Sequence, residues 1–318
     1  MKTVALGSSG LQVASLGYGG MRLSPSWDRE KVDAAAIEGG IKLLENAVDA
    51  GFTFIDHADI YGDTMCEMIH GRAMERHPEW RDRLVVATKC GIRWKDVPKD
   101  APHRYDFDGN HIRQSVDASL QRLKIDRIDL YQLHRPDVLM DPADIASAFV
   151  EVQKAGKVRH FGVSNFRPSQ VRALQSALPF PLVSNQVEIH FLRLATFDDG
   201  TLDQCLEMKM TPLAWSPMAG GRLGGAVDEN LSPELKDHEA QAAIFRLRPV
   251  LAEVAKQYGL SPLAILLAWQ MRHPSGIIPI IGTTRPEILR EAALADTITL
   301  DRDNWYKILL AARGQRLP

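Results

Sequence analysis

The feature that most constrains the fold of this chain is an alternation of short apolar runs with helical patterns. Amphipathic segments, of which 34–50, 110–123, 142–155 and 168–178 are the clearest, separate the runs. Strands that alternate with helices predict βαβ units and a parallel sheet. Eight such units close a (β/α)8 barrel, so we predict an α/β TIM barrel. The predicted strands are 13–19, 52–58, 84–91, 128–135, 158–165, 182–189, 211–218 and 276–283.

An open, doubly wound nucleotide-binding sheet is the main alternative. Such a sheet typically carries G-x-G-x-x-G directly after its first strand. Residues 17–22 read Gly-Tyr-Gly-Gly-Met-Arg and do not supply that spacing. The glycines here are also compatible with a simple tight turn, and we favour the barrel.

Some segments exceed the repeating unit of a barrel. Residues 3–5 and 13–15, joined by a glycine- and serine-rich stretch, predict an N-terminal β-hairpin that covers one barrel end. The stretch 92–104, rich in Pro, Asp and Lys, predicts a long loop. The helical patterns at 239–257 and 302–313 predict extra helices before the last strand and at the C-terminus. None of these pieces has the size of a second domain, so we expect residues 1–318 to form one domain.

The charge balance and the cysteines indicate the cellular setting. The chain has 38 Lys and Arg residues against 40 Asp and Glu residues, which argues against a nucleic-acid partner. No apolar run approaches the ~20 residues that cross a bilayer, and no signal peptide is visible. The three cysteines are scattered and without a CxxC pair, which indicates reduced thiols in the cytoplasm. We expect a monomer or a weak oligomer whose partner is a small molecule, not nucleic acid or a membrane.

Polar side chains stand at the carboxyl ends of three successive predicted strands. Asp56, Lys89 and His134 occupy these ends, and Tyr61 follows Asp56 in the run Asp-His-Ala-Asp-Ile-Tyr-Gly. In a parallel barrel the functional residues lie at this end, and neighbouring strands are ~4.8 Å apart. Each residue alone is more often a structural salt bridge or a satisfied polar group. Their coincidence on one face predicts a catalytic cluster.

The residue types in this cluster suit proton donation to a carbonyl group. A tyrosine hydroxyl titrates near pH 10, and the Lys89 ammonium would favour the phenolate that forms when Tyr61 loses its proton. Asp56 would keep Lys89 charged and oriented, and His134 would polarise the substrate oxygen by a hydrogen bond. Because the cluster holds no covalent nucleophile with its base, acyl transfer is disfavoured. The carbonyl then needs a hydride, which must come from a cofactor.

The blocks around this cluster make the chain resemble the aldo-keto reductases. Within that family it is similar to the bacterial oxidoreductases that have the Asp-His-Ala-Asp-Ile-Tyr-Gly form of the second motif. The resemblance implies a TIM barrel whose catalytic tetrad falls on Asp56, Tyr61, Lys89 and His134. The matching blocks, in the family's order, are 54–62, 88–91, 133–137, 156–165, 185–188 and 278–284.

The resemblance also implies an extended nicotinamide dinucleotide across the barrel mouth. Ser164, Asn165 and Gln186 would hydrogen-bond the nicotinamide carboxamide. Trp215 would stack on the nicotinamide ring, where the family usually has a tyrosine. Without the resemblance, the alternative is that Ser164 and Asn165 form a turn and that Trp215 is a core residue. Further contacts, including those of the loop that wraps the pyrophosphate, would come from Gly20, Met21, Asp56, Ser216, Met218, Gly220 and Gly221.

The adenosine phosphate end of the cofactor is expected after the last strand. Its contacts would come from Gly282, Thr283, Thr284, Arg285 and Glu291. A helix that starts near Pro286 presents backbone N–H groups, which attract anions. An Arg285 guanidinium that grips a 2′-phosphate favours NADP(H) over NAD(H), although Arg285 as a solvated surface residue is the alternative. At positions 288 and 292 the family often has a polar pair that contacts the 2′-phosphate and the adenine, and this chain has Ile288 and Ala292 instead.

Substrate contacts are expected from Tyr61, His134 and Trp94. Met21 and Trp27 are further candidates for pocket walls, because the loops after the first and third strands overhang the mouth. An aromatic residue at that place suits carbonyl substrates with apolar or aromatic bodies.

Two residues beside the tetrad are assigned structural roles. Strand alternation turns His57 away from Asp56, and we expect it to pack or to hydrogen-bond. By the same argument Cys90 faces the helices as a small buried hydrophobe. The remaining histidines lack a compact ligand spacing, and we predict no metal.

The predicted function is NADPH-dependent reduction of aldehydes and ketones, with Tyr61 as proton donor. A nucleotide-binding regulatory protein on the same fold, like the potassium-channel beta subunits, is the alternative from another class. A barrel isomerase or aldolase that forms a Schiff base on Lys89 would need a lysine of lowered pKa. Asp56 beside that lysine argues against it.

Overall fold

Parallel strands close into a barrel in the computed structural model of the chain, which describes residues 1–222 and 238–317. Each strand pairs in parallel with its two neighbours, and the last strand pairs with the first through Ile280 and Gly17. The predicted TIM barrel is therefore confirmed. In barrel order the strands are β3 (Gly17–Gly19), β4 (Phe54–Asp56), β5 (Val85–Cys90), β8 (Ile128–Leu133), β9 (Val158–Ser164), β10 (Leu182–Glu188), β11 (Thr211–Trp215) and β12 (Ile278–Ile281).

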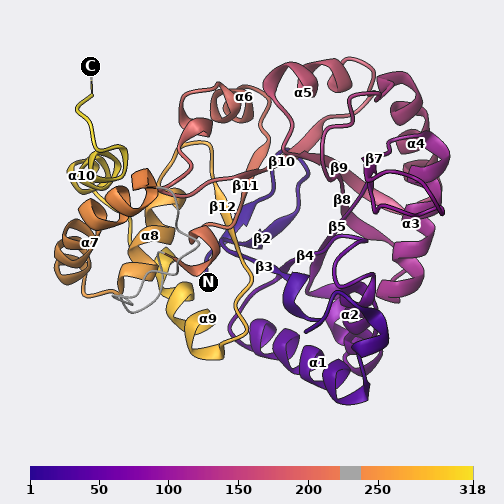
Figure 1. Cartoon of the computed structure of the whole chain (residues 1–318), viewed down its shortest axis with the longest axis horizontal. Helices are drawn as coiled ribbons and strands as arrows, with labels where there is room; N and C mark the ends of the chain where they lie inside the picture. The colour runs from indigo at the N-terminus through magenta and orange to yellow at the C-terminus, as the bar shows by residue number, and fades with distance from the viewer. Residues whose placement is uncertain (223–237, 318) are drawn as a thin grey trace.

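Helices surround the strands, as Figure 1 shows. Buried apolar side chains from the outer faces of the strands and the inner faces of the helices form the larger core. The last helix, α10, packs against α7 outside the ring, and the indole of Trp305 stacks on that of Trp269 at 5.0 Å between ring centroids. The helices are α1 (Ala34–Asp49), α2 (Met65–Arg76), α3 (Gly109–Leu123), α4 (Pro142–Lys154), α5 (Pro168–Gln175), α6 (Thr201–Glu207), α7 (His238–Tyr258), α8 (Pro262–Met271), α9 (Pro286–Ala293) and α10 (Arg302–Arg313).

Side-chain caps fix where several of these helices begin. An aspartate or serine before the first turn accepts a hydrogen bond from a backbone N–H group that lacks a helical partner. A proline in the first turn of α4 and α8 adds a preset backbone angle. The capping residues are Asp33, Asp108, Asp141, Ser261 and Asp301.

An N-terminal hairpin closes the amino end of the barrel, as predicted. Strands β1 (Thr3–Ala5) and β2 (Gln12–Ala14) pair antiparallel. Leu6, Leu11 and Val13 form a second apolar core with residues at the start of the barrel strands, such as Phe54. The hairpin thus covers the amino end of the barrel. The opposite end, where the strands have their carboxyl termini, stays open for the functional site.

The structure corrects two details of the sequence prediction. The predicted strand 13–19 is two strands, because the chain turns at Ser15, whose hydroxyl donates to Asp296 at 2.8 Å. The predicted loop 92–104 contains β6 (Ile92–Arg93), which pairs antiparallel with β7 (Arg104–Tyr105). The helices α2 and α6 also lie between predicted strands, in addition to the four amphipathic segments given as the clearest. The glycine-rich loop predicted at 220–225 beside the barrel mouth lies outside the described residues from residue 223 on.

No single helix in the described part of the chain is long and apolar enough to cross a membrane. A bent pair, Ala240–Tyr258 with Pro262–Met271, meets the length and composition criteria together, at an angle of 89°.

Candidate active site

The predicted tetrad assembles at the carboxyl end of the barrel. Asp56 ends β4, Lys89 lies in the adjacent β5, and the backbone N–H of His134 donates to Cys90 of β5 at 2.9 Å. The Lys89 ammonium lies 2.8 Å from each carboxylate oxygen of Asp56 and 2.6 Å from the carbonyl oxygen of His57. Lys89 is fully buried, so its charge depends on these partners.

Tyr61 joins the cluster from the loop after β4. Its ring centroid lies 5.2 Å from the Lys89 nitrogen and 5.9 Å from the centroid of the His134 ring. The two rings meet edge to face, an arrangement that fixes both planes. The four residues predicted from strand ends are therefore neighbours in space.

Burial and charge set the protonation states of the cluster. Burial raises the pKa of the Tyr61 phenol above its ordinary value of 10.0, and the Lys89 charge offsets only part of this rise. Burial alone would lower the pKa of Lys89, but the carboxylate of Asp56, together with Tyr61, outweighs burial and holds that pKa above 10.5. Burial, with the charges of Lys89 and Arg135, lowers the pKa of His134 well below 6.5. At neutral pH the site thus holds a protonated phenol, a charged lysine and a neutral histidine.

This electrostatic state argues against a Schiff base on Lys89. An amine that attacks a carbonyl must be neutral, and the Asp56 carboxylate stabilises the ammonium instead.

Two amides complete the surroundings of Asp56. Gln186 donates to its Oδ1 at 2.9 Å, and Gln132 approaches the same oxygen at 3.5 Å. Gln186 was predicted to face a nicotinamide, and it also links that side of the mouth to the tetrad.

A cavity of about 630 Å³ lies over the cluster at the mouth of the barrel. Its wall includes Asp56, Tyr61 and His134 of the tetrad. It also includes most of the residues predicted for the cofactor, namely Met21, Ser164, Asn165, Gln186, Trp215, Ser216, Met218, Gly220, Gly221, Gly282, Thr283, Thr284 and Arg285.

One end of the cavity carries a hydrogen-bonded amide. Asn165 takes a left-handed backbone conformation with φ of 61°, which turns its side chain at the end of β9. Its Nδ2 donates to Ser164 Oγ at 2.8 Å, and its Oδ1 accepts from the indole N–H of Trp215 at 3.0 Å. This geometry presents a flat indole beside amide and hydroxyl groups, which fits a planar ring that bears a carboxamide.

The other end of the cavity is built from backbone. Gly220 and Gly221 have φ of 71° and 94°, and in the part of the chain that the structure describes no atom beyond their chain neighbours lies within 4 Å of where a Cβ would stand on either. Arg285 precedes α9, in whose first turn Pro286 has no N–H group and the N–H of Ile288 already donates to the carbonyl oxygen of Arg285 at 3.1 Å. The helix start therefore offers the N–H of Glu287 beside the Arg285 guanidinium, fewer donors than the sequence predicts. Such an end attracts phosphate. The two ends together fit an extended nicotinamide dinucleotide.

Aromatic side chains rim the mouth beside Tyr61. The Trp27 ring lies 6.4 Å from Tyr61 and 6.1 Å from Trp94, edge to face in both cases. Both tryptophans are exposed, at 51% and 41%. This aromatic rim is the natural contact for the body of a substrate whose reacting group reaches Tyr61.

Some predicted residues do not line the cavity. Gly20 is buried, and a Cβ on it would meet His57 at 2.4 Å. Lys89 lies behind Tyr61, Trp94 stands at the rim, and Glu291 is on α9 away from the wall. Conversely, Arg22 and Arg135 line the cavity without having been predicted. Each follows a predicted site residue directly in the chain, and this adjacency is the signal that would have found them.

The two residues assigned structural roles behave as predicted. His57 is fully buried, and its Nε2 lies 2.8 Å from Nδ1 of His70 on α2. Cys90 is buried in the core between strands and helices. In the described residues, no group of three or more His, Cys, Asp or Glu side chains is arranged to hold a metal.

Comparison with known proteins agrees with this geometry. Residues 15–309 match the Aldo/keto reductase family. A 6-dehydroglucose reductase of Novosphingobium aromaticivorans is 39% identical over 98% of this chain and 96% of its own length. The oxidoreductase YdhF of Escherichia coli is 40% identical over 87% of this chain and 89% of its own. The crystal structure of the thermostable aldo-keto reductase Tm1743, in complex with the inhibitor epalrestat, superposes with a TM-score of 0.80 at 26% identity over 98% of this chain and all of that one.

Proposed function

The chain belongs to the aldo/keto reductase family, and from this premise we propose that it reduces aldehyde or ketone carbonyls to alcohols with NADPH. Its homologues are oxidoreductases. The observation that carries the proposal is the convergence of Asp56, Tyr61 and His134 at one end of one cavity, with Lys89 directly behind them.

The tetrad supplies the proton of the reduction. Tyr61 gives its phenolic proton to the carbonyl oxygen, and the Lys89 ammonium stabilises the phenolate left behind. Neutral His134 donates a hydrogen bond to the same oxygen and polarises the carbonyl. Asp56 holds Lys89 in its charged form throughout. The bound cofactor supplies the hydride.

The cofactor is held by the two ends of the cavity. Ser164, Asn165 and Gln186 would bind the carboxamide, with the nicotinamide on the face of Trp215. The glycines of η5 (Ala219–Gly221) would pass close to the pyrophosphate, and Arg285 would bind the 2′-phosphate that distinguishes NADPH from NADH.

The aromatic rim suggests which carbonyl compounds are accepted. An indole face packs well against aromatic rings and against the C–H face of a sugar. One relative is named a 6-dehydroglucose reductase, a name that denotes an oxidised sugar as substrate. We propose that the substrates are aldehydes with an aromatic or sugar body. Trp94→Ala should weaken the binding of these substrates more than that of small aldehydes such as propanal.

We further propose that the chain works as one domain in the cytoplasm, as a monomer or a weak oligomer. Its three free cysteines are buried and unpaired, which accords with a reducing compartment.

The test is to mix the protein with NADPH and a panel of aldehydes and ketones and to follow the consumption of NADPH as a loss of absorbance at the nicotinamide band. Turnover with NADPH, and slower turnover with NADH, is the expected result. Tight NADPH binding without turnover of any carbonyl would contradict the proposal and favour a regulatory role.

A further inference from the structure

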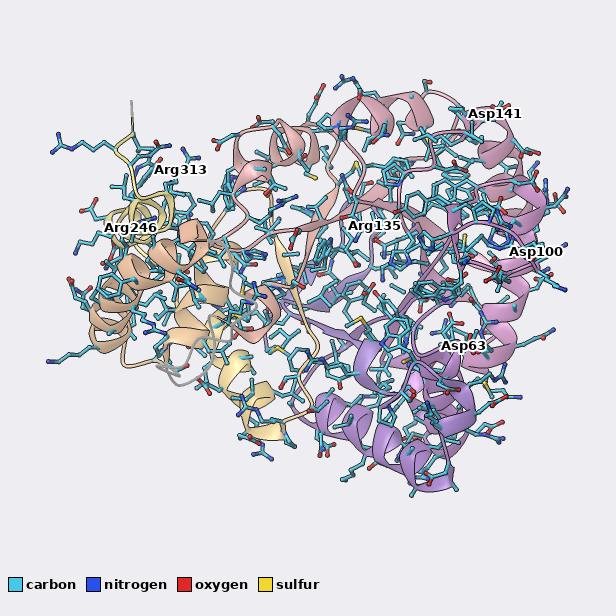
Figure 2. All side chains as sticks on the ribbon, viewed as in Figure 1. Asp63, Asp100, Arg135, Asp141, Arg246 and Arg313 are labelled. Atoms are coloured by element: carbon cyan, nitrogen blue, oxygen red, sulfur yellow. The ribbon has the colours of Figure 1, made fainter. Side chains whose placement is uncertain are left out.

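Arg135 lines the catalytic cavity without a partner for its charge. It follows His134 at the end of β8 and is partly buried. Its guanidinium carbon lies 5.6 Å from the ring centroid of Trp215. Among the described residues, no carboxylate lies within 4.0 Å of this guanidinium and no hydrogen bond satisfies it. Figure 2 labels Arg135 over the middle of the barrel, whereas the other labelled residues lie toward the edge.

The charge of the cavity wall is strongly one-sided. Its charged residues are Asp56, Arg22, Arg135 and Arg285. Asp56 is already neutralised by Lys89, so three arginines face the cavity and the wall itself carries no other carboxylate; Glu287, off the wall, makes a loose contact of 3.9 Å with Arg285. A cavity of this kind attracts anions.

The cofactor of the proposed function accounts for part of this charge only. Its anionic groups are the pyrophosphate and the adenosine 2′-phosphate, which belong to the glycine and Arg285 end. Arg135 lies at the opposite end, on Trp215 and next to His134, where the reduced nicotinamide carries no negative charge. No anionic group of the cofactor therefore reaches Arg135, and its charge is available to bind an anionic group of the substrate.

We propose that Arg135 binds a carboxylate group of the substrate, so that the enzyme prefers carbonyl compounds that carry a carboxylate. The inference rests on the proposed carbonyl reduction and names the substrate class for that site. A guanidinium holds a carboxylate through two parallel hydrogen bonds, and the Trp215 ring, 5.6 Å from the guanidinium carbon, keeps the cation of Arg135 at the cavity wall. Because Arg135 adjoins His134 in the chain, the bound carboxylate and the reacting carbonyl share the tetrad end of the cavity.

The experiment compares acids with their neutral esters. The substrates are 2-, 3- and 4-carboxybenzaldehyde and the methyl ester of each, at saturating NADPH, with wild type, Arg135→Met and Arg135→Lys. The three isomers vary the distance between carbonyl and carboxylate. Arg285→Met is the matched control, because it removes one arginine from the far end of the same cavity.

We expect the wild type to prefer at least one acid over its ester in kcat/KM. Arg135→Met should lower that acid-to-ester ratio roughly 10- to 100-fold, the loss typical of a hydrogen-bonded charge, and Arg135→Lys should restore part of it. Arg285→Met should leave the acid-to-ester ratio unchanged, although it should weaken the binding of NADPH. An unchanged ratio in Arg135→Met, or an equal fall in Arg285→Met, would overturn the proposal.

A binding measurement keeps the inference separate from the proposed function. The hydroxymethylbenzoates, which are the alcohols that correspond to the carboxybenzaldehydes, are titrated into the protein with NADP⁺ in a calorimeter. This measurement of binding needs no turnover. Binding that disappears in Arg135→Met supports the carboxylate site even if no carbonyl is reduced. Equal binding to wild type and Arg135→Met contradicts it even if the enzyme is an active reductase.

Discussion

The ammonium of Lys89 and the carboxylate of Asp56 form a two-point ion pair in which both oxygens lie 2.8 Å from the nitrogen and both side chains are almost completely buried. A buried pair of this kind is costly to break, because the remaining charge has no water to solvate it. The pair therefore links the charge state of the proposed catalytic site to the stability of the barrel.

Asp56→Asn should show both consequences. Removing one partner of a buried pair typically costs about 3–5 kcal/mol of folding free energy, and Lys89 would also lose the charge that holds its pKa high. Urea unfolding at pH 7 should report the loss, together with a fall in kcat. The control is Asp198→Asn, which breaks the exposed pair with Arg313 at 2.7 Å and should cost less than about 1 kcal/mol. Equal losses in the two variants would refute the argument.

Tyr61→Phe should remove the proposed proton donor and leave the proposed cofactor site in place. A positioned general acid contributes roughly 10²–10⁴-fold, and we expect kcat to fall by such a factor. Binding of NADPH, followed by quenching of tryptophan fluorescence, should change little. Tyr131→Phe makes the same chemical change at a tyrosine buried between strands and helices, and should keep its activity. A Tyr61→Phe enzyme with near-normal kcat would assign proton donation to another group.

The tetrad could be predicted because it depends only on strand order. Parallel strands end on one side of a barrel, so Asp56 and Lys89 had to meet once their strands were recognised. The contact of Trp27 with Trp94 joins two loops whose paths depend on local turns, and no periodicity describes it. The bonds of Gln186 to Asp56 and of Trp215 to Asn165 depend on side-chain rotamers and on the left-handed backbone of Asn165. The break at Ser15 was hidden for a similar reason, since its partner Asp296 lies far along the chain.

Arg285→Ala should reduce the preference for NADPH. Its side chain is 62% exposed and stands 3.9 Å from Glu287, a loose contact that leaves the guanidinium free to bind phosphate. We expect KM for NADPH to rise roughly 10- to 100-fold and KM for NADH to change little. Arg290→Ala, within the helix α9 that Arg285 precedes but off the cavity wall, provides the control. A ratio of NADPH to NADH use that survives Arg285→Ala would show that other groups select the phosphate.

The pair His57 and His70 should make the fold sensitive to acid. Both rings are fully buried, and burial lowers the pKa of His70 from 6.5 to about 3 and that of His57 well below 6.5. The folded protein therefore binds fewer protons than the unfolded chain once the pH falls below 6.5, and stability is lost from there down toward pH 3. At pH 5 each neutral histidine should cost about 2 kcal/mol relative to neutral pH. His70→Gln removes one of the two titrations and retains an amide that can bond His57.

The measurement is the free energy of urea unfolding at pH 7.5 and at pH 5 for wild type and His70→Gln. The readout is the difference between the two pH values, so a variant that is less stable at both still gives an answer. We expect this difference to shrink by about 2 kcal/mol in His70→Gln. The same substitution at the exposed His103 should leave the difference as in wild type. If His70→Gln loses as much stability on acidification as wild type does, then the buried histidine pair is not what makes the barrel sensitive to acid.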